Sequence, residues 1–126
     1  MKRFGFPKAA RIVRSRDFAR VQRRGRRLNV FPLRVRALPR GEGRSRLGLG
    51  VGRKVGKAVV RNRWKRAIRE AFRRNRHRLD RPYDLVISVA WEAEPNDIEH
   101  VPEAFLQVID ELKADDERTA DTAALD

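Results

Sequence analysis

The chain has no cysteine, only two histidines and no long apolar run among its 126 residues. Without cysteine it can form neither disulfides nor thiolate metal sites, and nothing in it indicates an oxidising compartment. No apolar run approaches the roughly 20 residues of a membrane-spanning helix. The basic N-terminal segment, residues 1–14, lacks the apolar centre of a secretory signal, so we treat it as mature protein. We therefore expect a cytoplasmic protein with one domain.

Residues that could carry catalysis or hold a metal ion are also few. His77 lies among arginines and His100 in an acidic segment, which favours surface positions for both over a nucleophile–histidine pair. A metal-dependent nuclease needs several carboxylates that converge beside its nucleic-acid surface. Residues 1–81 contain only four acidic residues, which are Asp17, Glu42, Glu70 and Asp80. We expect no catalytic residue, no protein-bound metal or cofactor, and no small-molecule substrate.

Negative charge is scarce in the first two thirds of the chain and concentrated in the last third. Residues 1–81 contain 29 lysines and arginines against four acids, a net charge of +25. Residues 82–126 contain two basic residues against 13 acids, a net charge of −11. The positive part opposes folding by self-repulsion unless a polyanion relieves it. Nucleic acid is the favoured partner, and an anionic membrane surface is less favoured because no basic segment has a broad apolar face.

The glycine-rich segment "GLGVGRKVGK", residues 48–57, does not form a phosphate-binding loop. A Walker loop would need glycine at the position of Val51 and serine or threonine at the position of Ala58. The glycines instead alternate with apolar residues, as in a strand that another part of the protein approaches closely. Packing is the favoured interpretation, and a smooth floor for an RNA backbone is the alternative. The alternating residues are Gly48, Gly50 and Gly52.

Patterns in the first half of the chain predict one helix and two strands. Ser15 is a suitable helix N-cap and Gly25 a suitable stop, which predicts a basic helix over residues 15–25. Apolar residues then alternate with polar residues or glycine in residues 30–38 and again in residues 45–53. The turn "PRGEG" between these two segments predicts that they form a β-hairpin.

A second helix, predicted to begin near residue 57, has two different sides. Its apolar residues share one stripe, which must pack against a sheet or another helix. Its opposite side carries positive charges four residues apart, which destabilise an isolated helix by roughly a few tenths of a kcal/mol per pair unless an anion binds. Arginine outnumbers lysine 25 to 6 in the chain, which favours bidentate phosphate contacts. The stripe contains Val60, Trp64, Ala67, Ile68, Ala71, Phe72 and Leu79, and the basic side contains Arg61, Lys65, Arg69, Arg73 and Arg76.

The C-terminal third predicts a buried strand followed by an acidic helix. Residues 83–91, "YDLVISVAW", are nearly all apolar, as in a central strand. A third helix begins between residues 98 and 102, where Pro102 leaves its start open. Residues 114–126 are acidic and lack an apolar period, which predicts a frayed or disordered tail. We expect one RNA-binding α/β domain over residues 1–113, followed by this tail.

The segment "RNRWKRAIRE", residues 61–70, resembles the signature of the protein subunit of bacterial ribonuclease P. In that family an RNR begins a helix and is followed by KR and RE at this spacing, and all of these positions match here. The preceding "LGLGVGRKVGKAVV", residues 47–60, resembles the family's strand and connector. The segment "RIVRSRDFARVQRRG", residues 11–25, resembles its first helix. The similarity extends from residue 11 or so to residue 90 or so.

The resemblance implies both a fold and a function. The fold is α+β, a two-layer α/β sandwich of the ribosomal-protein type with the order helix-strand-strand-strand-helix-strand-helix. Its βαβ crossover is left-handed, against the usual rule, and one of its strands is not located by the hydrophobic pattern. In function, a catalytic RNA with bound Mg²⁺ removes the 5′ leader of precursor tRNA, while the protein supports that RNA and holds the leader. This division agrees with the lack of catalytic residues in the chain.

Matching positions give two sets of site residues. The catalytic RNA and the nearby leader are expected at Arg53, Lys54, Lys57, Arg61, Asn62, Arg63, Lys65, Arg66, Arg69 and Arg73. A leader cleft between the first helix and the sheet is expected to contain Arg11, Arg14, Phe18, Gln22 and Arg36. The family often has aromatic residues at the positions of Gln22 and Arg36, so base stacking is reduced there unless the guanidinium of Arg36 replaces it. Phe18 is either a cleft residue or part of the core.

Two other functions remain open on the sequence alone. The same charge and fold would suit a ribosomal or other structural RNA-binding protein without a role in tRNA processing. A protein-only nuclease is disfavoured by the scarcity of carboxylates. The RNR spacing favours a ribonuclease P component over the first, and activity without added RNA would identify the second.

Overall fold

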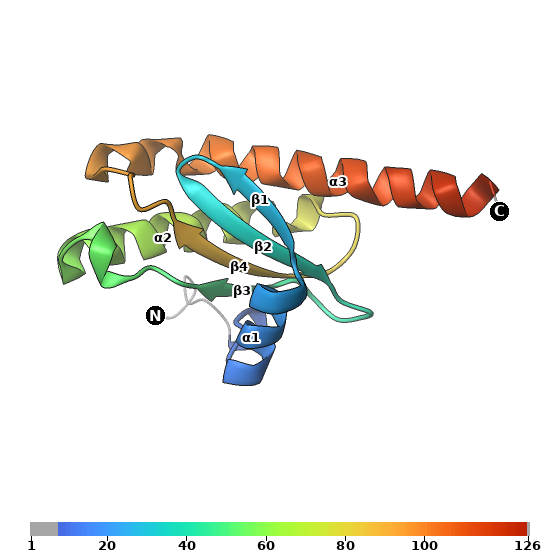
Figure 1. Cartoon of the computed structure of the whole chain (residues 1–126), viewed down its shortest axis with the longest axis horizontal. Helices are drawn as coiled ribbons and strands as arrows, with labels where there is room; N and C mark the ends of the chain where they lie inside the picture. Colours follow the sequence, from blue (N-terminus) through green and yellow to red (C-terminus); the bar gives the residue numbers. More distant parts are fainter. Residues whose placement is uncertain (1–7, 126) are drawn as a thin grey trace.

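Three α-helices and a four-stranded β-sheet make up this computed structural model, which describes residues 8–125 (Figure 1). Residues 1–7 of the basic N-terminal segment lie outside the described residues. The predicted order of helices and strands is confirmed. It runs α1(Ser15–Arg24), β1(Arg26–Val30), β2(Leu33–Pro39), β3(Arg46–Leu49), α2(Ala58–Asn75), β4(Tyr83–Val89) and α3(Val101–Leu125), with 3-10 helices η1(Lys8–Ala10), η2(Arg53–Val55), η3(Arg76–Arg78) and η4(Pro95–His100).

Strand β4 lies inside the sheet, whose strand order is β1-β2-β4-β3. It pairs antiparallel with β2, from Val89 opposite Leu33 to Tyr83 opposite Pro39, and parallel with β3. Every residue of β4 is buried except the half-buried Ser88, which confirms the central strand that its apolar run predicted. The parallel β3–β4 pair is joined through α2, as a parallel pair requires a crossover connection.

Two expectations for the strands are wrong. Residues 30–38 and 45–53 do not form a hairpin, because β4 lies between β2 and β3 and pairs with both. The first of these segments is also not a single strand, because the chain turns at Phe31 and β1 pairs antiparallel with β2. Strand β1 is therefore the one that only the resemblance implied. Of its five residues only Leu28 and Val30 are apolar, so it shows little alternation of its own.

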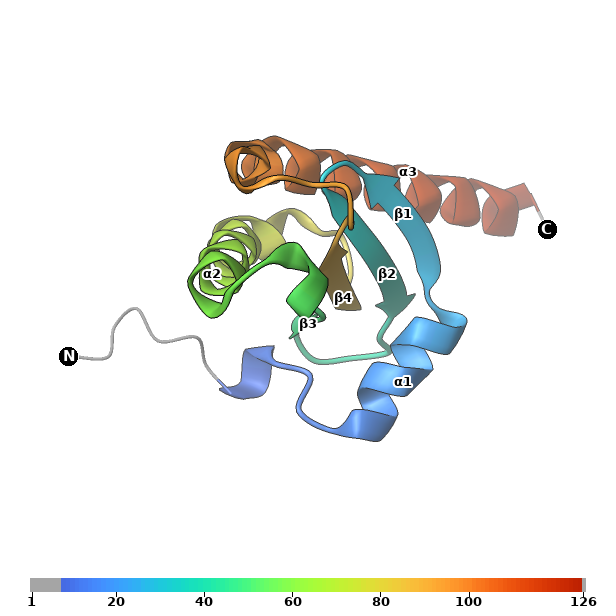
Figure 2. The same cartoon turned by 60° about the vertical axis from the view of Figure 1, so that its left-hand side comes forward.

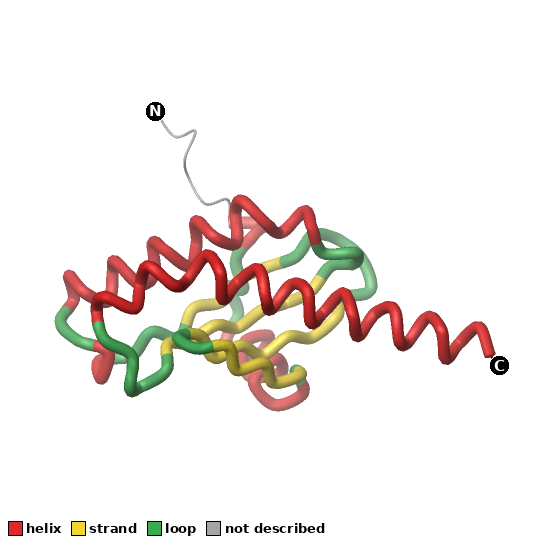
Figure 3. The backbone as a smooth tube through the Cα atoms, turned by 90° about the horizontal axis from the view of Figure 1, so that it is seen from above, coloured by secondary structure: helices red, strands yellow, loops and turns green. Residues whose placement is uncertain are grey.

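The two faces of the sheet carry different layers. Helices α2 and α3 cover one face, and α1 lies against the other (Figures 2 and 3). The predicted apolar stripe of α2 is confirmed, since Trp64, Ile68, Ala71 and Phe72 are buried in the core. Phe72 meets Phe105 of α3 edge to face, with ring centroids 6.4 Å apart. No helix among residues 8–125 is long and apolar enough to cross a membrane.

Helix α3 is longer than we expected. It begins within the predicted range but continues beyond residue 114, where we expected a frayed or disordered tail. Asp115 lies 2.9 Å from Arg26 Nε, and Asp116 accepts a 2.8 Å hydrogen bond from the hydroxyl of Tyr83. Burial and this hydrogen bond raise the pKa of Tyr83. Polar contacts therefore hold this part of α3, whose sequence has no apolar period. The last turns of the helix project past the sheet (Figure 3).

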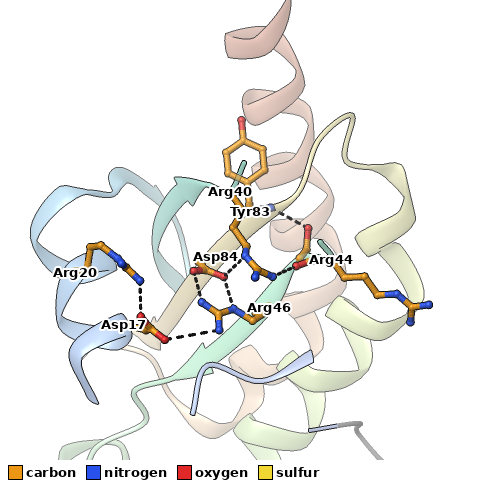
Figure 4. A network of polar contacts seen from close by, with 8 residues as sticks. Asp17, Arg20, Arg40, Arg44, Arg46, Tyr83 and Asp84 are labelled. Carbon is orange, nitrogen blue, oxygen red and sulfur yellow. Dashed lines mark hydrogen bonds and ion pairs between the residues drawn. The ribbon is translucent and has the colours of Figure 1, made fainter. Parts of the chain in front are cut away.

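A buried carboxylate joins the beginnings of β3 and β4 to α1 (Figure 4). Asp84 accepts two hydrogen bonds from Arg46, from Nε at 2.8 Å and from Nη2 at 2.7 Å, and Arg40 Nε lies 3.6 Å away. Arg46 Nη1 also lies 3.7 Å from Asp17 of α1. The hydrogen bonds to Asp84 raise the pKa of Arg46. Because Asp84 is almost fully buried, its charge depends on these arginines for stabilisation.

We expect Asp84→Ala to lower the free energy of unfolding by about 2–4 kcal/mol, because it leaves the largely buried Arg46 without its bidentate partner. Glu42→Ala is the matched control. Glu42 is exposed and forms no ion pair with another described residue, so its removal should change stability by about 0.5 kcal/mol or less. Urea denaturation of both variants measures the difference. Equal stabilities of the two variants would contradict the role assigned to Asp84.

Candidate nucleic-acid interface

The first three turns of α2 present a row of cationic side chains to solvent. None of these side chains forms an ion pair or a hydrogen bond with another residue of the described range 8–125. The Nε atom of Arg61 is buried and has no hydrogen-bond partner among the described residues. The exposed cations of the row are Arg63, Arg66 and Arg69, and the half-buried ones are Arg61 and Lys65. The uncharged Asn62 lies exposed beside them.

Three more predicted residues lie just before α2. Arg53 and Lys54 belong to η2, Lys57 is the N-cap residue of α2, and all three are exposed. Gly56 has a φ of 145°, a conformation that favours glycine, where the chain turns into the helix. The N-cap makes no side-chain hydrogen bond to the first turn of α2. The positive end of the helix dipole therefore adds to the charge of these cations.

Arg73 differs from the other predicted residues of α2. Its guanidinium donates two hydrogen bonds to Glu70, from Nε at 3.1 Å and from Nη2 at 2.5 Å. Arg74 Nε donates to the same carboxylate at 2.7 Å. The hydrogen bonds from Arg73 and Arg74 hold the pKa of Glu70 at about 2. Arg73 is thus engaged in an ion pair within α2, unlike the residues nearer the beginning of the helix.

A cleft of about 320 Å³ lies between α1 and the sheet. Two predicted residues line it, Gln22 from α1 and Arg36 from β2. Arg36 donates a hydrogen bond to the backbone carbonyl of Gln22, which connects the strand to the helix. The lining contains three arginines and no carboxylate. The other lining residues are Arg27, Asn29, Arg34, Val35, Val86 and Ser88.

Sequence reasoning missed six of the eight residues that line this cleft. Arg27 and Asn29 come from β1, the strand that the hydrophobic pattern did not locate. Arg34 belongs to the alternating pattern of β2 but received no role. The alternation itself contained the necessary signal, because residues two apart in a strand share a face and Arg34 must therefore lie beside Arg36.

Phe18 packs on the sheet beside the cleft and is not among the residues that line it. A Cβ atom added at Gly48 would lie 2.8 Å from Phe18 Cε2 and 3.3 Å from Ile12 Cδ1, so the missing side chain makes room for Phe18. This geometry supports the packing interpretation at Gly48. The last two predicted cleft residues, Arg11 and Arg14, are exposed in the segment that leads into α1 and do not line the cleft either.

The chemistry of both surfaces is that of binding. Their side chains are cations and amides, which can contact phosphates and base edges. No group of three or more histidine, aspartate or glutamate side chains within residues 8–125 could hold a metal ion. Neither surface brings together a nucleophile and a general base.

The sequence and the fold are similar to those of known bacterial proteins. The family model described as Ribonuclease P matches residues 6–113. The ribonuclease P protein component of Dictyoglomus thermophilum is 40% identical over 86 residues, which cover 68% of this chain and 72% of that protein. The component of Chlamydia trachomatis serovar L2 is 39% identical over 112 residues, covering 88% and 92%. A solved structure of the RNase P protein from Thermotoga maritima matches with a TM-score of 0.69 and 33% identity, covering 79% of this chain and 96% of that one.

We expect Gly48→Ala to lower the free energy of unfolding by about 1–3 kcal/mol, because the added methyl group would displace the ring of Phe18 from the sheet. Gly52→Ala is the control, since nothing lies within 4 Å of a Cβ atom there and its φ is −85°. Urea denaturation compares the two variants. A Gly48→Ala protein as stable as Gly52→Ala would show that the glycine is not needed for this packing.

Proposed function

This chain belongs to the ribonuclease P protein family, and from this premise we propose that it binds the catalytic RNA of ribonuclease P and the 5′ leader of precursor tRNA. Membership of this family makes the chain a protein component of a ribonucleoprotein endonuclease that acts in tRNA processing. The alternative, a ribosomal or other structural RNA-binding protein, is not favoured. In the proposal, RNA with bound Mg²⁺ hydrolyses the substrate, and the chain supplies no catalytic residue.

The proposal also covers the extent of the functional unit and its location. The proposed RNA-binding domain comprises residues 1–113, and the acidic end of α3 follows it, with Asp115 and Asp116 in contact with that domain. The cytoplasm is the proposed compartment, because precursor tRNA and the catalytic RNA are the proposed partners.

The unpaired cations of α2 and η2 are the observation that carries the proposal. Glu70, the one carboxylate of α2, is occupied by Arg73 and Arg74, so it neutralises none of them. Such a row of like charges opposes folding, whereas RNA phosphates supply the missing acceptors. The proposed contacts of the catalytic RNA are Arg53, Lys54, Lys57, Arg61, Asn62, Arg63, Lys65, Arg66 and Arg69. Arg73 joins them only if it exchanges Glu70 for a phosphate.

The cleft between α1 and the sheet is the proposed leader site. Single-stranded RNA is held by grooves that combine positive charge with surfaces for the bases. The three arginines that line the cleft supply the charge, and Gln22 and Asn29 supply amide groups for base edges. Arg11, Arg14 and Phe18 would extend this surface along the approach to α1. Binding both RNAs on one basic protein lowers the repulsion between two polyanions.

Reconstitution tests this function. We expect the protein to accelerate cleavage of precursor tRNA by ribonuclease P RNA at low Mg²⁺, where repulsion between the two RNAs is least screened. A substrate with its leader shortened to a single nucleotide should gain much less from the protein. No stimulation would refute the proposed function. Cleavage by the protein without added RNA would refute its non-catalytic role.

We expect Arg69→Ala to weaken binding to the catalytic RNA and to flatten the slope of log affinity against log salt by somewhat under one unit, as for the loss of one phosphate contact. Lys113→Ala is the control. It removes the same charge from α3, outside both proposed RNA surfaces, and should leave the slope unchanged. Filter binding over a range of salt concentrations measures both. An unchanged slope for Arg69→Ala would remove Arg69 from the interface.

A further inference from the structure

Two large aromatic side chains lie exposed at one end of the sheet, outside both proposed RNA surfaces. Trp91 follows β4 and is 70% exposed, and Phe31 lies in the turn between β1 and β2 and is 50% exposed. Ala90 N donates a 2.9 Å hydrogen bond to Pro32 O, so the two segments lie side by side. We propose that Phe31 and Trp91 form a stacking platform for bases of the single-stranded leader of precursor tRNA.

The platform lies between the two surfaces of the proposed function, on which this inference rests. On one side, Asn29 and Arg34 form the second pair of β1 and β2 residues from the turn, after Val30 and Leu33, and both line the cleft. On the other side, β3 runs parallel to β4 and finishes at the same end of the sheet. There η2 follows, with Arg53 as its first residue. Figure 1 shows the β1–β2 turn, the end of β4 and the beginning of α2 at the same end of the sheet. A leader that extends from α2 to the cleft therefore passes the platform.

The packing of the fold does not account for the exposure of these rings. Neither ring has an aromatic or cation–π contact with another residue of the described part of the chain. Their position also complements the cleft, because the cleft has Gln22 and Arg36 where the family often has aromatic residues. Stacking on an aromatic ring tolerates any base, as a leader of variable sequence requires.

The charges around the platform favour RNA over a basic protein partner. Glu94 and Asp97 cap η4 reciprocally, and Glu94 N donates to Asp97 Oδ2 at 2.8 Å, so these two acids are engaged in the helix start. Glu92 and Glu94 are the exposed acids nearest to Trp91 in the sequence. Arg34 on one side and Arg53 and Lys54 of η2 on the other outnumber these two exposed acids. Phosphates that flank a stacked base would contact these cations.

Fluorescence can observe the platform directly, because the chain has only two tryptophans. Trp64 is fully buried, whereas Trp91 is exposed. A single-stranded leader oligonucleotide that stacks on Trp91 should quench its emission and leave that of Trp64 unchanged. Trp91→Phe isolates the Trp64 signal and should show no quenching. Binding detected by anisotropy without quenching of Trp91 would overturn the proposal.

Affinity measurements with the reconstituted holoenzyme test whether stacking contributes to substrate binding. We expect Trp91→Leu to weaken binding of precursor tRNA by about tenfold and binding of mature tRNA not at all. Phe31→Leu should act in the same direction, whereas Trp91→Phe should retain most of the affinity because it keeps an aromatic ring. Leu106→Ala, which alters an exposed apolar residue of α3, is the control and should change nothing. Urea denaturation of each variant checks that the fold is intact.

Several outcomes would overturn the platform. One is unchanged binding of precursor tRNA by Trp91→Leu, and another is an equal loss of affinity for precursor and mature tRNA. A third is an effect on self-association of the protein alone, which would assign Phe31 and Trp91 to a contact between two copies. Normal stimulation of cleavage combined with any of these overturns the platform alone. Wild-type protein that fails to stimulate cleavage overturns the proposed function and the platform together.

Discussion

Repulsion among like charges is the constraint that the rest of the structure has to satisfy. Residues 1–81 carry a net charge of +25 and must pack into one small domain. Salt screens exposed charges only beyond a distance of about 8–10 Å, so neighbouring arginines on one helix still repel. The compensating charge comes largely from the acidic last third of the chain, whose residues fold back against the basic part as β4 and α3.

The ion-paired carboxylates contact arginines of the sheet and of the second half of α2, and not the cationic row at the beginning of α2. Asp84 pairs with Arg46, and Asp115 pairs with Arg26 at the edge of the sheet. Glu70 engages two arginines in the second half of α2. The exposed pairs of Glu70 contribute only about 0–1 kcal/mol each to stability. Their main effect is to decide which arginines stay unpaired. Unpaired cations remain at the beginning of α2 and arginines line the cleft, where a bound polyanion would complete the neutralisation.

The sequence predicted those elements whose pattern is set by burial on one side. Trp64, Ile68 and Phe72 recur every fourth residue, and this spacing determined both sides of α2. Strand pairing was not predictable in the same way, because the turn residues favoured a local hairpin while β4 enters the sheet from much later in the chain. The extension of α3 was missed because Asp115 and Asp116 hold it through polar contacts, which leave no apolar period.

The candidate site was predictable to the extent that its residues are contiguous. The row on α2 follows from one unbroken segment, whereas the cleft combines α1 with three strands, one of them unrecognised. Glu70 has Arg66 four residues before it and Arg74 four residues after it, and spacing alone does not decide between them. The folded geometry selects Arg74, together with Arg73, and leaves Arg66 exposed and unpaired within the described range.

Arg36 explains how the cleft could hold RNA without the aromatic side chains common in the family. Its hydrogen bond to the carbonyl of Gln22 orients the guanidinium, whose other N–H groups and planar faces can meet a phosphate or a base. Contacts of this kind weaken as salt rises, because they depend on the release of counterions. Stacking on Phe31 and Trp91 depends much less on salt. The proposed division of charge in the cleft and stacking at its end would therefore keep the leader bound at ionic strengths that weaken the cleft alone.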